Sequence, residues 1–179
     1  MKIYSQPLPD VFVIEPSVFK DGRGNFVKTY HKFDFVQLGI DYDVAEEYYT
    51  TSQKNVIRGM HFQAPPHDGI KLIYCINGSV LDVVIDLRKS SPKFGSYQSI
   101  ELSSANKLML MVPGGFAHGF LSLEDHTIMV YKNTFVYAPA HDTGIRWDSF
   151  GFDWPIRDPI TSERDRSFSS LADCVSPFP

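Results

Sequence analysis

Short strand-like segments separated by turn residues recur along most of the chain, and this pattern limits the possible folds. Residues that favour strands, β-branched and aromatic, fill segments 11–16 (VFVIEP), 25–30 (NFVKTY), 71–76 (KLIYCI) and 126–135 (HTIMVYKNTF). The connections carry Gly, Pro, Asn or Asp, as in PPHDG, NGS, SSPKFGS and PGG. Many short strands joined by tight turns predict an all-β protein, either an antiparallel sandwich or a barrel.

Six further strands are expected, at residues 44–49, 55–62, 79–87, 96–102, 108–113 and 119–123. In SVLDVVIDL (79–87), apolar residues at alternate positions share one face, while Asp82 and Asp86 share the other. Helical turns are expected only at 33–40 and near 162–171. No repeat or linker divides the sequence, so we expect one domain over residues 1–179, with an irregular or helical tail from about residue 155.

Composition and charge exclude several classes of function. The formal net charge of −4 argues against general binding to nucleic acid or to an anionic membrane. No apolar run approaches the ~20 residues that span a bilayer, and the N-terminal segment MKIYSQPLPD lacks the apolar core of a signal peptide. Cys75 and Cys174 are too few for a disulfide framework or a zinc ribbon, and Cys75 is expected to be buried and unreactive. We therefore expect a cytoplasmic protein.

Polar residues on the strand-like segments are the first candidates for a functional site. Arg58, His61 and Lys71 belong to the stretch IRGMHFQAPPHDGIK, and His118 and Tyr131 lie on later segments with apolar neighbours. A buried cation without a partner is unfavourable, so such residues usually face a counter-ion or a bound anion. Each one alone could be an ordinary core or surface residue. Together they favour one shared cavity.

A metal site is not expected in that cavity. The spacing P-x-G-x-x-H at 113–118 looks like the second half of a cupin metal-binding signature. The first half would offer a second histidine and a glutamate, but His61 is followed by Phe62 and Gln63, so too few ligands remain for zinc or iron. His67 is expected to be an exposed turn residue. A metal-dependent cupin enzyme stays as an alternative that metal analysis of the purified protein would test.

Several motifs in the same order resemble the dTDP-4-dehydrorhamnose 3,5-epimerase family, the RmlC-type nucleotide-sugar epimerases. They are DGRGNF, NVIRGMHFQ, GIKL, DVVIDLRKSSPKFG, VPGGFAHGF, VYKNT and GIRWD, and they cover nearly the full chain. The resemblance implies a cupin-like antiparallel jelly roll that uses neither a metal nor another cofactor. It also implies a homodimer that exchanges N-terminal strands. The implied reaction inverts C3, C5 or both in a nucleotide-linked 4-keto-6-deoxyhexose, for deoxysugar and polysaccharide biosynthesis.

The resemblance also assigns four catalytic roles. His61 is the base that removes a proton from a carbon next to the ketone, and Asp165, in the SERD motif, orients its imidazole. Lys71 places its ammonium near the C4 oxygen, where negative charge develops. Tyr131 returns a proton to the opposite face, which inverts the stereocentre.

The remaining predicted site residues bind substrate. By the resemblance, Arg23, Arg58 and His118 meet the diphosphate and the sugar, because positive groups suit phosphate oxygens, and Phe26 lies near the nucleotide base. Further predicted binding positions are Lys28, Glu46, Tyr48, Asp142 and Arg164.

Four of these positions, in three segments, depart from the family pattern. Lys28 stands where members usually have glutamate, Glu46-Glu47-Tyr48 replaces a Q-x-N segment, and Asp142 replaces a glutamate. Glutamate only accepts hydrogen bonds and would favour a base edge with an N–H donor. The nucleotide is therefore expected to be dTDP on family grounds, with a CDP- or GDP-linked mono-epimerase as the alternative. A non-catalytic sugar-nucleotide-binding jelly roll is a third hypothesis.

Overall fold

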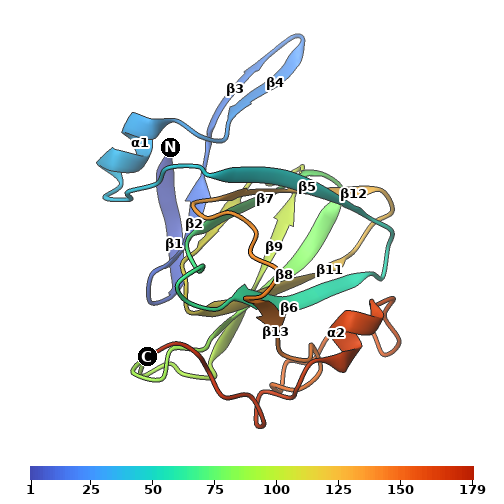
Figure 1. Ribbon diagram of the computed structural model, residues 1–179. Coiled ribbons are helices and arrows are strands. Elements are labelled where there is room, and N and C mark those ends of the chain that lie inside the picture. The colour runs from blue at the N-terminus through green and yellow to red at the C-terminus, as the bar shows by residue number, and fades with distance from the viewer.

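Two antiparallel sheets and one separate hairpin contain all the strands of the chain. A computed structural model describes residues 1–179 (Figure 1). The six-stranded sheet has the order β1 (Lys2–Leu8), β2 (Val11–Glu15), β10 (Met109–Val112), β7 (Lys71–Asn77), β12 (Thr127–Asn133) and β5 (Glu46–Ser52). The five-stranded sheet has the order β13 (Asp142–Gly144), β6 (Ile57–Gln63), β11 (Phe116–Ser122), β8 (Ser79–Asp86) and β9 (Tyr97–Ser103). The predicted all-β, cupin-like jelly roll is confirmed.

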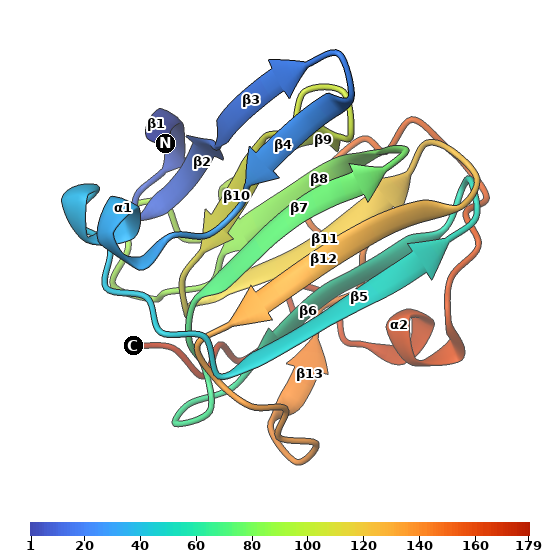
Figure 2. The same cartoon turned by 90° about the horizontal axis from the view of Figure 1, so that it is seen from above.

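The sheets lie face to face, with β7 over β8, β12 over β11 and β5 over β6 (Figure 2). The hairpin of β3 (Ser17–Asp21) and β4 (Gly24–Lys28) pairs with neither sheet and extends away from the sandwich (Figure 1). The two helices, α1 (Lys32–Gln37) and α2 (Glu163–Ser167), fall within the segments predicted to be helical. Neither is long and apolar enough to cross a membrane.

Every predicted strand is present, but three strands of the structure had not been predicted. These are β1, β3 and β13. The first six residues of β1 and all five of β3 are exposed or half-buried, so neither shows a regular alternation of apolar and polar residues. β13 has only three residues, which is too short for any periodic signal. All three lie at a sheet edge or outside the sandwich.

Apolar side chains fill one part of the space between the sheets and cover both outer faces. The inner cluster includes Ile73, Val84, Leu110 and Phe120, and Cys75 is buried there as predicted. The outer face of the five-stranded sheet is covered by residues from the C-terminal region, such as Trp154, Leu171 and Phe178. The outer face of the six-stranded sheet is covered near α1, by Phe35 and Tyr42 among others. The tail from about residue 155 therefore packs against the domain.

Both faces of β8 are buried, although alternation of apolar and polar residues usually indicates a strand with one buried and one exposed face. Val83 and Ile85 belong to the outer cluster, whereas Val80 and Val84 belong to the inner one. Asp82 shares the inner face and is completely buried. The polar side of this strand therefore points into the sandwich, where a buried carboxylate requires a partner.

A shift in strand register brings Arg58 and His61 to the same face of β6. In an uninterrupted strand, residues three positions apart would face opposite sides. Here His61 is opposite His118 and Arg58 is opposite Phe120, so three steps on β6 match two on β11. Gly59 makes this irregularity possible: its φ is +133°, and a Cβ on it would lie 2.6 Å from Gly119 Cα.

We expect the substitution Gly59→Ala to lower the free energy of unfolding by about 1–3 kcal/mol, because it combines an unfavourable φ with a backbone clash. Gly22→Ala is the matched control, since a Cβ on Gly22 meets no atom within 4 Å. Urea denaturation of both variants measures the difference. Equal midpoints for Gly59→Ala and the wild-type protein would contradict the close approach of the two strands.

Candidate active site

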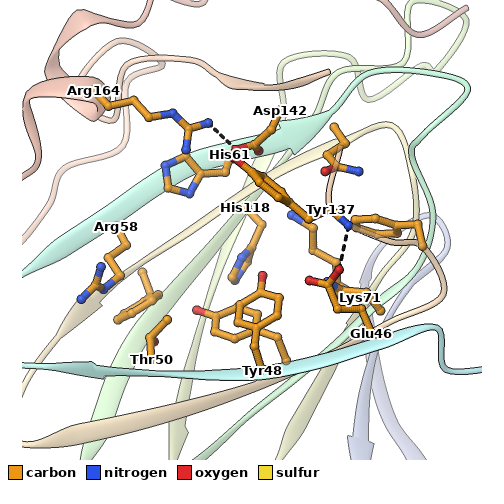
Figure 3. A pocket seen from close by; sticks show the side chains of 15 residues that line it. Glu46, Tyr48, Thr50, Arg58, His61, Lys71, His118, Tyr137, Asp142 and Arg164 are labelled. Atoms are coloured by element: carbon orange, nitrogen blue, oxygen red, sulfur yellow. Dashed lines mark hydrogen bonds and ion pairs between the residues drawn. The ribbon is translucent and has the colours of Figure 1, made fainter. Parts of the chain in front are cut away.

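A cavity of about 390 Å³ opens between the two sheets (Figure 3). It lies at the side of β5 and β6, whose place in the sandwich is seen in Figure 2. Its lining is Glu46, Tyr48, Thr50, Arg58, His61, Gln63, Lys71, His118, Phe120, Tyr131, Asn133, Phe135, Tyr137, Asp142 and Arg164. Side chains from β5, β7 and β12 meet others from β6, β11 and β13 across it. The cavity is therefore built by both sheets.

Most of the residues predicted from the sequence line this cavity, and Asp165 lies behind His61. Three of them do not reach it: Arg23, Phe26 and Lys28 lie on the β3–β4 hairpin. There Arg23 pairs with Asp21 at 2.6 Å, and the Phe26 ring is exposed. Within one chain, the hairpin residues are separate from the site.

His61 and Asp165 form a hydrogen-bonded couple at the wall of the cavity. His61 Nε2 donates to Asp165 Oδ1 at 2.7 Å, and the backbone N–H of Gly59 donates to the other carboxylate oxygen at 3.0 Å. Burial alone would raise the pKa of Asp165, but the hydrogen bond and charge of His61, with that of Gly59, hold the pKa below its ordinary value. In the neutral imidazole, with Nε2 donating, His61 Nδ1 is an acceptor. The couple suits a proton acceptor.

A second imidazole–carboxylate couple lies deeper between the sheets. His118 Nε2 lies 2.8 Å from Asp82 Oδ2, and both side chains are buried. Burial raises the pKa of Asp82, while the charge and hydrogen bond of His118 oppose the shift. No role for Asp82 is predicted from the sequence. Its position on the same face as Val84, which faces the other sheet, was the only signal.

Lys71 brings a positive charge into the cavity from the six-stranded sheet. Burial lowers the pKa of its ammonium from 10.5 to about 8, while the negative charges of Asp142 and Asp82 oppose the shift. The group is therefore mainly a cation at neutral pH. An ammonium with so little water around it interacts strongly with any negative charge that develops near it.

Tyr131 and Tyr48 face the cavity from adjacent strands. They are directly opposite each other on β12 and β5, and their rings stack with centroids 4.9 Å apart. Burial raises the pKa of Tyr131 well above its ordinary value, and Tyr48 and Asp82 add to this. Tyr131 is therefore a neutral phenol that can donate a proton.

The mouth of the cavity carries arginines and aromatic rings. Arg58 donates to Ser52 Oγ at 3.1 Å and to the carbonyl oxygen of Thr51 at 3.0 Å. Arg164 pairs with Asp142 at 2.6 Å and lies beside Asp142 in Figure 3. These cations suit an anionic ligand.

Sequence reasoning missed several lining residues, of which Gln63 and Tyr137 are the clearest. Gln63 Nε2 donates to the carbonyl oxygen of His67, and its Oε1 accepts from the N–H of Ala138, so it joins two loops at the mouth. Tyr137 is 56% exposed there, and its backbone N–H donates to Glu46 at 2.7 Å. Gln63 is two positions after His61 and therefore lies on the same face of β6, so its place in the site could have been predicted from the sequence. Tyr137 lies in the loop after β12, and no sequence pattern indicates its place.

The arrangement places a proton acceptor and a proton donor on opposite sheets, with a cation also in the cavity. It can remove a proton next to a carbonyl group, stabilise the enolate and return a proton to the other face. A metal has no evident place in this scheme, because no three His, Cys, Asp or Glu side chains are placed to hold one. His61 and His118 each use one ring nitrogen in a hydrogen bond to a carboxylate, so that nitrogen is not available as a metal ligand.

Comparison with known proteins identifies one family of enzymes over nearly the whole chain. The family model of dTDP-4-dehydrorhamnose 3,5-epimerase matches residues 5–173. The enzyme of that name from Escherichia coli K12 is 39% identical over 179 residues, covering 98% of this chain and 97% of that protein. The enzyme from Methanothermobacter thermautotrophicus is 40% identical over 169 residues, covering 92% and 91%.

Solved structures agree over the same length. A crystal structure of dTDP-4-dehydrorhamnose 3,5-epimerase from Bacillus anthracis, with TDP and PPi bound, has a TM-score of 0.93 and 38% identity, covering 95% of this chain and 99% of that one. A structure of dTDP-6-deoxy-D-glucose-3,5-epimerase from Legionella pneumophila, in complex with dTDP-4-keto-L-rhamnose, has a TM-score of 0.93 and 31% identity. It covers 99% of this chain and 97% of that one.

The pKa of Lys71 can be tested directly. We expect its ammonium to titrate at about 8, and Asp142→Asn to lower this pKa further by removing a negative charge that favours the cation. NMR titration of ¹³C-methylated lysines gives the value, and its signal is assigned with Lys71→Arg. The control Asp148→Asn removes an exposed carboxylate that pairs with Arg146, and it should leave the titration unchanged. A midpoint near 10.5 would contradict the burial of this cation.

Proposed function

The chain belongs to the dTDP-4-dehydrorhamnose 3,5-epimerase family, and on this premise we propose that it is an isomerase that inverts C3, C5 or both in a nucleotide-linked 4-keto-6-deoxyhexose. The observation that carries the proposal is the placement of His61 and Tyr131 on the two opposing sheets, with Lys71 in the same cavity. A ligand bound between the sheets would meet the two groups from opposite sides.

The reaction begins with removal of a proton from the carbon next to the ketone. His61 Nδ1 takes the proton, the electron pair of the C–H bond forms a C=C bond to C4, and the π pair of the C4 carbonyl moves onto its oxygen to give an enolate. Asp165 accepts the hydrogen bond of Nε2 and stabilises the imidazolium that results. Lys71 donates a hydrogen bond to the enolate oxygen, and its charge offsets the negative charge there.

The reaction ends with protonation of the enolate carbon from the other face. The electron pair of the enolate forms the new C–H bond with the phenolic proton of Tyr131, leaving a phenolate and an imidazolium. Solvent then restores both groups to their starting protonation states. Removal on one face and return on the other inverts the stereocentre. This requires only side chains of the cavity, and no metal or organic cofactor takes part in the proposed steps.

The cations and aromatic rings at the mouth are proposed to bind the nucleotide diphosphate. Arg58 and Arg164 supply planar donors for phosphate oxygens, and the exposed ring of Tyr137 can stack on a base. Glu46 accepts the Tyr137 N–H through one oxygen, and the Tyr48 ring stacks on Tyr131. The preference for dTDP over the CDP- or GDP-linked alternative rests on the relatives, whose structures contain TDP or a dTDP-linked sugar.

We further propose a homodimer in which the β3–β4 hairpin of each chain completes the site of the other. The hairpin pairs with neither sheet, and its exposed rings, Phe19 and Phe26, pack on each other at 6.1 Å. Exposed aromatic side chains on a projecting hairpin are typical of an interaction surface. Through this exchange Arg23, Phe26 and Lys28 would reach a nucleotide in the partner's cavity.

The function is tested by incubating the protein in D2O with dTDP-, CDP- and GDP-linked 4-keto-6-deoxyglucose. NMR then follows deuterium exchange and inversion at C3 and C5 separately. We expect exchange with inversion at one or both carbons, with the dTDP sugar preferred. The absence of exchange at both carbons of all three substrates would refute the proposed activity.

We expect His61→Asn to lower the exchange rate by about 10²- to 10⁴-fold, because the base is lost. Binding of dTDP, measured by calorimetry, should change little, since the arginines remain. The control His126→Asn alters an exposed histidine at φ 57°, a conformation that asparagine adopts readily, and it should exchange at the wild-type rate. A near-native rate in His61→Asn would remove this residue from the role of base.

We expect Tyr131→Phe to separate exchange from inversion. His61 can still remove the proton, but without the phenol the proton returns mainly to the face it left. The variant should therefore incorporate deuterium mostly with retained configuration. Tyr49→Phe, on the outer face of the same sheet, is the control. An unchanged yield of inverted product per exchange event would show that the returning proton comes from another donor.

The shared site is tested by mixing two inactive variants. His61→Asn has an intact hairpin, and Arg23→Ala has an intact cavity, so a mixed dimer would contain one complete site. Random exchange of an equal mixture should restore about a quarter of the wild-type sites. Light scattering shows whether the protein is a dimer. A monomer, or a mixture no more active than its separate components, would exclude the exchange of hairpins.

A further inference from the structure

Tyr48 occupies a position where it can control the direction of the Tyr131 phenol. The two residues are direct neighbours across β5 and β12, and their rings lie 4.9 Å apart at an interplanar angle of 15°. Tyr131 is 6% exposed, whereas Tyr48 is 40% exposed and lies on the edge strand of its sheet. Figure 3 shows the Tyr48 ring directed into the cavity.

Two aromatic rings contact that of Tyr131, and only one of them stacks on it. His118 contacts it edge-on at 6.2 Å, and Tyr48 covers one face. His118 is itself fixed by Asp82, so this contact does not depend on Tyr48. A tyrosine on a strand has two common χ1 rotamers, and the neighbouring side chains decide which one is populated. Tyr48 lies on the edge strand β5, directly beside Tyr131 on β12. Its ring therefore stands in the way of any movement of the Tyr131 ring toward that edge of the sheet.

We propose that Tyr48 is a positioning residue whose stacked ring holds the Tyr131 phenol over the face of the sugar opposite His61. The proposal rests on the proposed function and deepens it. The enolate has two fates: it takes a proton from Tyr131 and is inverted, or it takes the proton back from His61 and keeps its configuration. A phenol that points away from the carbon favours the second fate.

The role belongs to the ring of Tyr48 rather than to its hydroxyl group. Burial raises the pKa of Tyr48, so it is neutral and carries no charge to the enolate. Its position at an exposed edge, with one face against Tyr131, leaves stacking as its main contact with the catalytic group. Loss of one aromatic contact corresponds to about a two- to tenfold change in an equilibrium between two orientations.

The test compares Tyr48→Phe, which keeps the ring, with Tyr48→Leu, which removes it. Each variant is incubated in D2O with the 4-keto sugar that the wild-type protein accepts, and NMR gives the inverted product per exchange event. This ratio describes only the active molecules, so it does not depend on the fraction that folds. Tyr49→Leu, at a 69% exposed position on the other face of β5, is the matched control.

We expect Tyr48→Leu to lower the ratio by about two- to tenfold, while Tyr48→Phe and Tyr49→Leu keep the wild-type ratio. An unchanged ratio in Tyr48→Leu would overturn the proposal. An equal loss in Tyr48→Phe would also overturn it, because the hydroxyl group would then be responsible. Failure of the proposed function is distinct from both, since the wild-type protein itself would exchange no deuterium.

Discussion

The carboxylate of Asp165 is the group on which the rest of the site depends. One oxygen accepts the hydrogen bond of His61 and the other accepts the N–H of Gly59, so one side chain fixes both the imidazole and the irregular part of β6. Asp165 reaches this point from α2, whose first turn is capped by Ser162. The C-terminal segment is therefore needed for the geometry of the site as well as for the cover of the outer face.

The space between the sheets is divided between apolar packing and charged groups. Where side chains such as Ile73, Val84 and Phe120 meet, the sheets are held together by burial of apolar surface. The charged region has compensated pairs, His118 with Asp82 and Arg164 with Asp142. Lys71 has no such partner, and its lowered pKa reflects the unfavourable burial of its charge. Such a group can be retained because a ligand supplies the negative charge that the protein does not.

The positions of the interior strands could be predicted from the sequence because their side chains are sorted by burial. β8, β10, β11 and β12 are almost fully buried and β7 is buried in its centre, so their apolar runs stand out. β1 and β3 are exposed over most of their length and carry no comparable pattern. An edge strand is stabilised by backbone hydrogen bonds to one neighbour, and these leave little trace in side-chain chemistry.

The sequence by itself determined the all-β class, the family and most of the residues that line the cavity. Short strand-like segments indicate the class, and motifs in a fixed order indicate the family and, through it, the site residues. Only the tertiary structure decided how they meet. It put Arg58 and His61 on one face of β6 through a register shift at Gly59. In a regular strand, whose side chains alternate between the two faces, these residues would lie on opposite faces. It turned Asp82 inward onto His118, and it stacked Tyr48 on Tyr131. Each of these contacts joins residues at least 36 positions apart or depends on how neighbouring strands pair, and local sequence carries no record of pairing.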